Sequence, residues 1–232
     1  MIWQKNPATR KRLAFTLVEL LVVIAIIVIL AALAFPVTTS MIERGNTTKC
    51  MNNLKQIGGA ITQYMLDNDG YLPYSAGPSY EGKSTSHPFS GWQAPLAYYL
   101  GAGQLSPSTP YKTQASYDNP TAKHPFNCPS CKTAFRAYTA NKQAMGFLPS
   151  GNAFRQRKTT YFTNLSKLVL IADDTAGDPS PNNSGADQFD ETNYLTLIGQ
   201  RHNGKANILF ADFHIECLSR TNLITADNIK QQ

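Results

Sequence analysis

A hydrophobic run near the amino terminus limits most strongly how this chain can fold. Residues 20–35 include no polar side chain, and extending the run back to Phe15 adds only Thr16 and Glu19. As a helix, residues 15–35 rise about 1.5 Å each, or roughly 31 Å in total, which matches a bilayer core of about 30 Å. The run therefore predicts a helix that spans a membrane.

Charge is distributed unevenly around this run. Four of the 21 Lys and Arg residues and none of the 15 acidic residues precede Phe15. The formal charge of +6 therefore falls to about +2 for the rest of the chain. By the positive-inside rule, residues 1–14 stay in the cytoplasm and the chain after Pro36 lies on the far side. Basicity confined to one flank is typical of a topology signal, so we expect no nucleic-acid partner.

Glu19 is the anomaly in the run, because a carboxylate near the end of a membrane helix carries a desolvation cost and usually has a partner. If the chain were cut between Ala14 and Phe15, the new amine of Phe15 would lie about one helical turn away, or at the same depth on a neighbouring subunit. The alternative is that Glu19 lies at the headgroup boundary without a function. Spacing alone leaves both hypotheses open.

The pattern beyond Pro36 stays helical, with apolar residues mostly three, four or seven positions apart. It predicts an amphipathic stem helix over residues 37–70. Residues 45–48 (GNTT) are poor helix formers, where we expect a kink or a loosened turn. Gly70 is expected to end the stem as a left-handed cap.

The rest of the chain predicts a loop-rich body with a small sheet. Residues 71–160 are rich in Pro, Gly, Ser and Tyr, which indicates loops around one short helix at residues 92–100. Four later segments have strand-like composition, namely residues 168–172, 194–200, 206–211 and 215–218. Asn203 and Gly204 predict a type I′ hairpin turn between the second and third. We therefore expect an antiparallel meander packed on the stem helix.

The cysteine content permits disulfides without requiring them. The four cysteines, Cys50, Cys128, Cys131 and Cys217, are too few for a disulfide scaffold, but outside the cytoplasm they allow two bridges in any of three pairings. Cys128 and Cys131 form a CxxC motif. Because no second CxxC and no βαβ pattern accompanies it, a structural bridge is favoured over zinc binding or redox chemistry.

Residues 11–36, KRLAFTLVELLVVIAIIVILAALAFP, resemble the prepilin-type cleavage and methylation segment of type IV pilins and type II secretion pseudopilins. The resemblance continues more weakly through KCMNNLKQIGGAITQYMLDNDGYLP. It implies that a prepilin peptidase cuts before Phe15 and methylates the new amine. It also implies that Glu19 neutralises that amine as subunits stack, and that Pro36 kinks the helix. Ala14 stands where the family has Gly.

The resemblance implies an α+β, pilin-like fold, in which a long amino-terminal helix, transmembrane and then amphipathic, packs on a small antiparallel sheet. The expected parts are a basic leader (1–14), a transmembrane or filament-core helix (15–36), the stem (37–70) and a globular body (71–232). The implied function is a structural subunit of a type II secretion or type IV pilus-like filament, not an enzyme. The implied partners are the prepilin peptidase, other pilin or pseudopilin subunits, an inner-membrane assembly platform and membrane lipid.

The implied location is the bacterial inner membrane, with one span, a cytoplasmic amino terminus and a periplasmic or extracellular body. Two alternatives concern processing. Residues 32–34 (ALA) form an A-x-A pattern, so signal peptidase could release a soluble protein beginning at Phe35. The chain could also remain an uncleaved anchor. Neither alternative explains the FTLVE pentad. In proteins of this kind a stem Cys often accompanies a Cys-Pro in the body, which implies a Cys50–Cys128 bridge and leaves Cys131 for Cys217.

The segment RHNGKANILFADFHIE resembles the H-x9-DG element found near the carboxy terminus of many pseudopilin-like proteins. His202 and Asp212 match that element, whereas Phe213 replaces its Gly. Because a bulky residue does not easily take φ above zero, we expect this turn to differ from that of the family.

His202, Asp212 and His214 also suggest an alternative function, a secreted or anchored enzyme or binding protein with a metal site on the hairpin. A minor pilin that acts as an adhesin lies between the two classes. We favour a structural role, in which Asp212 caps the turn and both histidines lie at a solvent-exposed rim. No nucleophile or third metal ligand is evident.

Acidic residues are concentrated in one segment of the carboxy-terminal third: Asp173, Asp174, Asp178, Asp187, Asp190 and Glu191. Calcium is the one cofactor that this pattern suggests, because hard cations take several carboxylate and carbonyl oxygens from flexible loops. The resemblance points the same way, since major secretion pseudopilins hold calcium in a carboxy-terminal loop. The spacing matches no known motif, so a solvated acidic loop without a cofactor is favoured.

Overall fold

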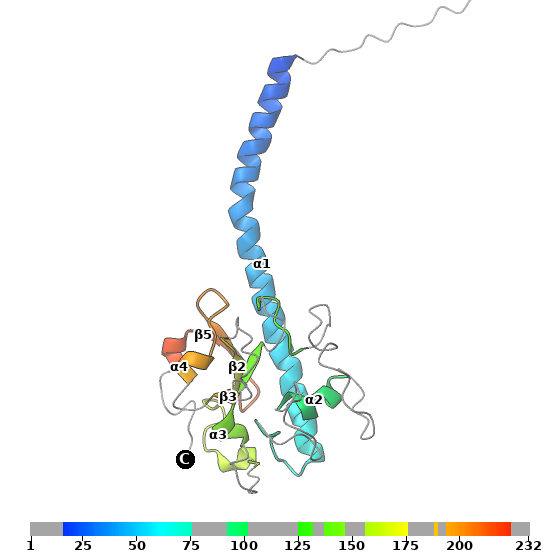
Figure 1. Cartoon of the computed structure of the whole chain (residues 1–232), viewed down its shortest axis with the longest axis vertical. Helices are drawn as coiled ribbons and strands as arrows, with labels where there is room; N and C mark the ends of the chain where they lie inside the picture. Colours follow the sequence, from blue (N-terminus) through cyan, green and yellow to red (C-terminus); the bar gives the residue numbers. More distant parts are fainter. Residues whose placement is uncertain are drawn as a thin grey trace, which may run out of the picture. The chain divides into compact units, whose positions relative to one another are not determined.

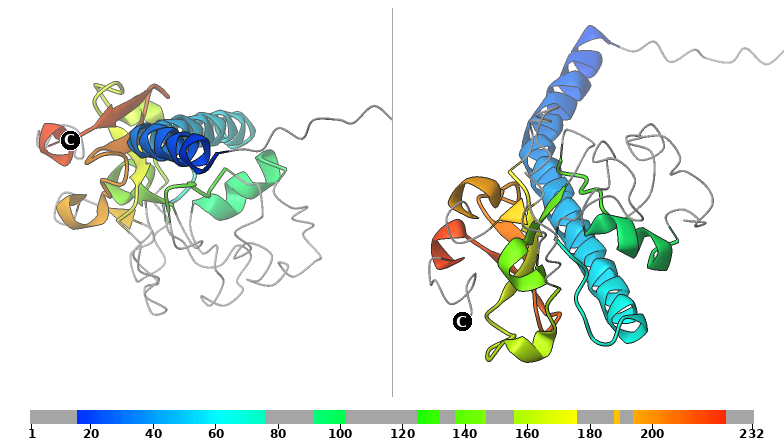
Figure 2. Two further views of the ribbon diagram at one scale, coloured as in Figure 1. Left: turned by 90° about the horizontal axis from the view of Figure 1, so that it is seen from above. Right: turned by 60° about the horizontal axis from the view of Figure 1, so that its bottom comes forward.

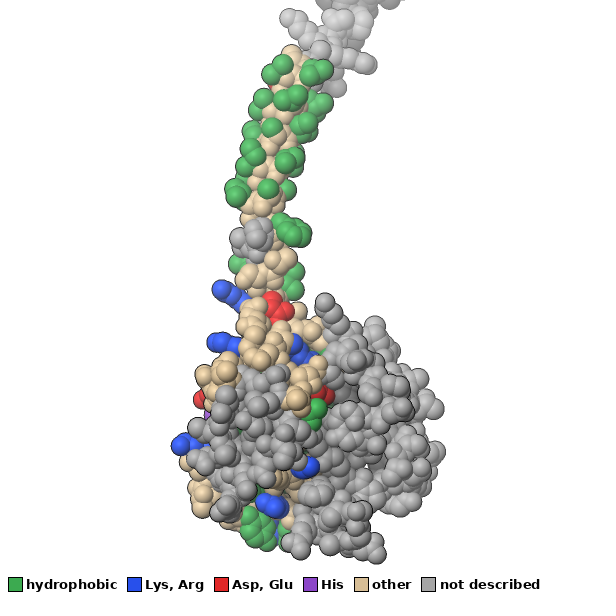
Figure 3. All heavy atoms as spheres, turned by 60° about the vertical axis from the view of Figure 1, so that its left-hand side comes forward, with side chains coloured by type: hydrophobic (Ala, Val, Ile, Leu, Met, Phe, Trp, Pro, Cys, Tyr) green, Lys and Arg blue, Asp and Glu red, His purple; other side chains and the backbone are tan. Residues whose placement is uncertain are grey.

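Helix α1 runs without interruption from Leu17 to Asp67 and is divided between two units, Met1–Ile42 and Glu43–Gln232. The computed structural model describes residues 16–75, 92–101, 125–131, 137–146, 156–175, 188–189 and 194–223. In the first unit, α1 exposes every large apolar side chain described from Leu17 to Phe35 (Figure 3). Apolar side chains lie all around this part of the helix, so it has no polar face to turn towards water.

In the second unit, the carboxy-terminal half of α1 supplies the centre of the core. Cys50, Leu54, Ile57 and Ile61 are fully buried, and their spacing places them along one stripe of the helix. The sheet lies on one side of this half of α1 and helix α2 (Gln93–Tyr99) on another (Figures 1 and 2). The prediction of a stem helix whose apolar face packs on a sheet is confirmed.

The weak helix-forming segment at residues 45–48 does not interrupt α1. The hydroxyls of Thr47 and Thr48 donate to the carbonyl oxygens of Glu43 and Arg44, at 2.9 and 3.0 Å. These bonds to the preceding turn keep both side chains inside the helical geometry. The expected loosening is therefore wrong, because side-chain hydrogen bonds and burial of the following turns outweigh the low helix propensity.

The end of α1 follows the predicted cap. The amide of Gly70 donates to the carbonyl oxygen of Met65 at 2.8 Å, and Gly70 has φ +79°. This bond satisfies a carbonyl that the helix itself leaves without a donor.

The sheet has five strands in the order β3-β1-β2-β4-β5. The neighbours β1, β2, β4 and β5 pair antiparallel, and β3 pairs parallel with β1. Their bounds are Tyr138–Asn141 (β1), Val169–Asp173 (β2), Gln188–Phe189 (β3), Ala206–Phe210 (β4) and Ile215–Leu218 (β5). The short helices are α3 (Lys142–Met145), α4 (Tyr194–Leu197), η3 (Thr159–Tyr161) and η4 (Arg220–Leu223). The α+β fold with a small antiparallel sheet is confirmed; β1 and β3 were not predicted.

Both faces of the sheet are covered. On β4, Leu209 belongs to the core shared with α1, whereas Ala206, Ile208 and Phe210 belong to a second cluster on the opposite face. Alternation of side chains along the strand accounts for this division. A strand buried on both faces explains why residues 206–211 are almost continuously apolar.

The prediction of a strand at residues 194–200 is wrong for the first half of this segment, which forms α4. Only Ile198 keeps a strand-like contact, a single bridge to Asp174. The amide of Gly199 donates to the carbonyl oxygen of Asp173 at 2.8 Å. The pairing is limited to this bridge, so β-rich composition alone did not suffice to form a strand here.

Substituting Gly199 by Ala is expected to destabilise the fold by about 2–3 kcal/mol. The added Cβ atom would lie 2.6 Å from the carbonyl carbon of Asp174, and a backbone group cannot rotate away as a side chain can. Gly59→Ala is the matched control. It adds a Cβ inside α1 with nothing within 4 Å, and should stabilise by about 0.5–1 kcal/mol. Equal denaturation midpoints for the two variants would contradict this account of Gly199.

Of the predictions for the two turns of the hairpin region, one is confirmed and one is wrong. Asn203 and Gly204 have φ of +52° and +78° between the reciprocal 3.1 Å bonds of His202 and Lys205, which confirms the predicted turn. Phe213 takes φ +68°, so the expectation that it avoids the glycine conformation is wrong. Its ring packs over Gly58 of α1, where an added Cβ would lie 3.5 Å from the ring. That contact offsets the backbone cost.

Candidate functional site

The amino-terminal turn of α1 is closed by a capping box. The carboxylate of Glu19 accepts from the Thr16 amide at 2.9 Å and from the Thr16 hydroxyl at 2.8 Å, and the Glu19 amide donates back to that hydroxyl at 3.3 Å. Reciprocal bonds of this type satisfy donors that the helix start leaves unpaired. Glu19 therefore has a local role that the sequence analysis did not foresee. Ala14 and Phe15, the predicted cleavage position, lie outside the described residues.

Within the described part of the chain, α1 is the one helix long and apolar enough to cross a membrane. Its large side chains between Leu17 and Phe35 are 47–78% exposed. Burying one such side chain yields about 1.5–3 kcal/mol, so more than a dozen of them make exposure to water untenable. Either lipid or neighbouring helices must cover this surface. The helix continues through Pro36.

The second candidate site begins with a disulfide. Cys50 on α1 and Cys128 are bonded, with their Cα atoms 5.2 Å apart, which is the pairing that the resemblance implied. Cys131 and Cys217 are not joined to each other, so the second pairing is wrong. The reason is positional. Cys131 is held in a tight turn by the bond from its amide to the Cys128 carbonyl oxygen (2.9 Å), whereas Cys217 is held by the β4–β5 ladder.

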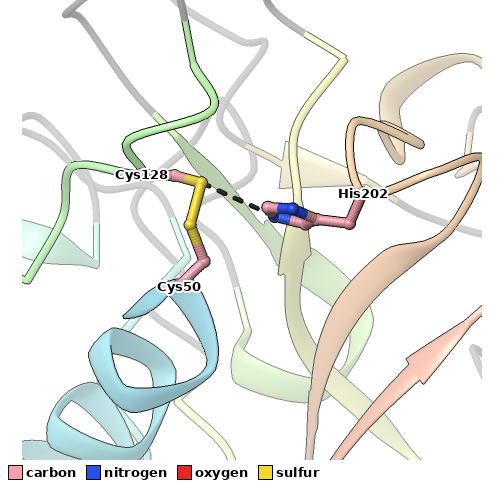
Figure 4. A group of neighbouring side chains, drawn as sticks. All are labelled: Cys50, Cys128 and His202. Carbon is pink, nitrogen blue, oxygen red and sulfur yellow. Dashed lines mark hydrogen bonds between the residues drawn. A yellow bond between two sulfur atoms is a disulfide. The ribbon is translucent and has the colours of Figure 1, made fainter. Parts of the chain in front are cut away.

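His202 packs against this disulfide from the sheet side, with its Nε2 atom 3.6 Å from the Cys128 Sγ atom (Figure 4). Its Nδ1 atom lies 3.1 Å from both the Glu43 carboxylate and the Thr47 hydroxyl. Since Thr47 uses its own proton on the Glu43 carbonyl, these neighbours assign the ring proton to Nδ1. Glu43, Thr47 and Cys50 lie on one helix face through their spacing of four and three.

Asp173, the last residue of β2, completes the cluster. Its Oδ2 atom accepts from the Asn207 amide at 2.6 Å and lies 3.4 Å from His202 Nε2. Among the residues that the structure describes, its Oδ1 atom has no hydrogen-bond partner although the side chain is fully buried. Burial raises the pKa of Asp173 to about 6, against the opposing effects of the Arg201 guanidinium, the Asn207 amide and His202.

The periphery of the cluster is also polar. Ser130, between the two CxxC cysteines, donates to the Glu43 carboxylate at 3.2 Å. Tyr138 donates to the Cys50 carbonyl oxygen at 3.3 Å, and burial raises the pKa of Tyr138 far above its ordinary value. The cluster therefore ties α1, the 128–131 turn and the sheet together. We call Glu43, Thr47, Cys50, Cys128, Asp173 and His202 the histidine–disulfide cluster.

The hairpin metal site suggested by His202, Asp212 and His214 is not assembled. His202 is 2% exposed and lies in the histidine–disulfide cluster, which corrects its expected place at a solvent-exposed rim. His214 instead contacts Asp212 and Glu216 and stacks on Phe210 with ring centroids 4.3 Å apart. Asp212 caps its turn by accepting from the His214 amide at 3.2 Å, as predicted.

The structure describes two of the six residues of the acidic segment. Asp173 and Asp174 are buried, and Asp173 belongs to the histidine–disulfide cluster, not to a loop. The other four acids lie outside the described residues, namely Asp178, Asp187, Asp190 and Glu191. The favoured prediction of a solvated acidic loop, like its calcium alternative, is therefore untested there.

Sequence reasoning missed Glu43, Thr47 and the true place of Asp173. Glu43 and Thr47 share a helix face with Cys50, and this spacing was the available signal. Asp173 directly follows the apolar segment 168–172 in the sequence, which was a signal for burial. No spacing in the sequence brings β2 beside α1, so the meeting of these residues could not be foreseen.

The capped apolar helix and the stem packed on a small antiparallel sheet together define a pilin-like protein. Residues 9–35 match the model described as prokaryotic N-terminal methylation motif. Residues 47–168, more than half of the chain, match the model described as protein of unknown function (DUF1559), and the chain belongs to that family.

Curated relatives match part of the chain. The type II secretion system core protein G of Pseudomonas aeruginosa is 39% identical over 62 residues, covering 27% of this chain and 44% of the relative. Core protein G of Klebsiella pneumoniae is 31% identical over 90 residues (36% and 64%). Type IV major fimbrial protein FimA of Dichelobacter nodosus is 35% identical over 111 residues (48% and 54%). The chain thus spans about half the length of these relatives. No solved structure gives a significant match.

Proposed function

We propose that this chain is a structural subunit of a type II secretion or type IV pilus-like filament and has no catalytic role. The observation that carries the proposal is the apolar, exposed first part of α1, capped by Thr16 and Glu19 and matched by the methylation motif. Such a surface is stable only when lipid or other helices cover it. A subunit that leaves the bilayer for a filament uses both environments in turn.

The proposed assembly follows from the charges. The basic residues 1–14 hold the amino terminus in the cytoplasm, α1 crosses the inner membrane once, and the body lies outside. Prepilin peptidase cuts before Phe15 and methylates the new amine, and an inner-membrane platform adds subunits to the filament. The disulfide supports an oxidising location for the body. Nothing in this role requires a cofactor.

Mass spectrometry of the mature amino terminus tests the proposal. We expect N-methyl-phenylalanine at Phe15 in protein isolated from membranes or filaments. Because Ala14 replaces the family's Gly, the Ala14→Gly variant should be processed at least as completely. A mature protein that begins at Phe35 would instead identify a soluble protein released by signal peptidase, and an intact amino terminus would identify an uncleaved anchor.

A further inference from the structure

Three electron-rich atoms meet inside the histidine–disulfide cluster. His202 Nε2 lies 3.6 Å from Cys128 Sγ and 3.4 Å from Asp173 Oδ2, and the ring proton is already placed on Nδ1. The lone pairs of these atoms point to one region, where a cation would be attracted by all of them.

Two distances in the cluster match edges of a zinc coordination tetrahedron. With Zn–S about 2.3 Å, Zn–N about 2.05 Å and Zn–O about 2.1 Å, a tetrahedron has S···N and N···O edges of about 3.6 and 3.4 Å. The observed separations of His202 Nε2 from Cys128 Sγ and from Asp173 Oδ2 have these values. The donor atoms of Cys50, Cys128 and His202 all lie within 4.8 Å of one another. Asp173 lies outside that group of three and contacts it through His202, and the two bonded sulfur atoms must separate on reduction before both can bind one ion.

The surroundings also suit a metal ion. Glu43 accepts from His202 Nδ1 at 3.1 Å, the carboxylate–histidine arrangement that orients a zinc-bound imidazole. Asp173 is fully buried, and its Oδ2 atom is held in place by the bond that it accepts from the Asn207 amide at 2.6 Å. Two thiolates and the Asp173 carboxylate give the ligand set with zinc a net charge of −1. Beside it, the Glu43 carboxylate adds one negative charge and the Arg201 guanidinium one positive charge.

We propose that the dithiol form of this protein binds one Zn²⁺ through Cys50 Sγ, Cys128 Sγ, His202 Nε2 and Asp173 Oδ2. A small-molecule dithiol supplies two electrons and two protons to the Cys50–Cys128 bond, yielding two thiols and its own cyclic disulfide. Zinc then displaces the two thiol protons. The disulfide in the oxidised form, or the metal in the reduced form, links α1 to the 128–131 turn and the sheet. The body therefore stays folded in both redox states. This inference does not depend on the filament assignment.

The test uses the full chain in detergent micelles, reduced by a dithiol that is then removed anaerobically. We expect the reduced protein to bind one zinc ion and the oxidised protein none. Cobalt should give the thiolate-to-metal charge-transfer band and the visible bands of a tetrahedral site. Asp173→Asn should weaken zinc binding at least about tenfold with little change in shape. If reduction unfolds the body, zinc should restore its circular dichroism.

Two serine variants separate this site from a zinc site on the CxxC motif. Cys50→Ser should abolish stoichiometric binding, whereas Cys131→Ser should keep it. The reverse result would assign the metal to Cys128 and Cys131 and overturn the proposal. So would a folded, reduced protein that takes up no zinc, or an unfolded one that zinc does not restore. His214→Ala, outside the cluster, controls for adventitious binding and should bind as the unaltered chain does.

Discussion

Replacing both Cys50 and Cys128 by alanine is expected to lower the free energy of unfolding of the oxidised protein by about 4 kcal/mol. The bridge closes a segment 78 residues long, and constraining an unfolded chain by a loop of that length accounts for about this amount. Both cysteines are buried, so the substitution also removes packed sulfur. Chemical denaturation of the metal-free chain in micelles, followed by circular dichroism, measures the difference.

The matched control replaces Cys131 and Cys217 by alanine. Both side chains are half-buried and neither is in a disulfide, so this pair should change the free energy of unfolding by less than about 1 kcal/mol. The histidine–disulfide cluster would lose its stabilising role if the two double variants were equally destabilised. If only the Cys131 and Cys217 double variant lost stability, the stabilising bridge would involve those two cysteines and not Cys50 and Cys128.

Glu19→Ala is expected to leave membrane insertion and cleavage intact while reducing incorporation into filaments at least about a hundredfold. Leaving the methylated amine of Phe15 without its carboxylate in an apolar interior costs about 3–5 kcal/mol, and each 1.4 kcal/mol is a factor of ten. Immunoblots of membrane and sheared-filament fractions compare insertion with assembly.

Glu19→Gln separates charge from capping. Glutamine can still accept from Thr16 in a capping box, but it carries no charge. We expect it to fail in assembly as alanine does. Thr16→Ala removes the cap and keeps the carboxylate, so it should assemble with only a small loss. Normal assembly of Glu19→Gln would show that Glu19 acts as a cap.

Local patterns predicted the elements that depend on local energetics. The apolar run and the 3.6-residue periodicity predicted α1, and residues 168–172 and 206–211 predicted β2 and β4. The Asn203-Gly204 turn was also predictable, because the left-handed conformation of these residues is a local preference. The failures had tertiary causes. Residues 194–200 carry strand-like composition but form α4, and Phe213 takes a glycine conformation because it packs over Gly58.

By itself, the amino-acid sequence determined that the chain has an apolar helix that water cannot solvate, a basic flank before it and a sheet-forming carboxy-terminal third. These properties belong to single segments, so no contact with a distant segment is needed to establish them. Only the tertiary structure decided which polar residues meet. Asp173, His202 and Glu43 come from three parts of the chain, and their proximity to the disulfide follows from packing β2 and the hairpin against α1.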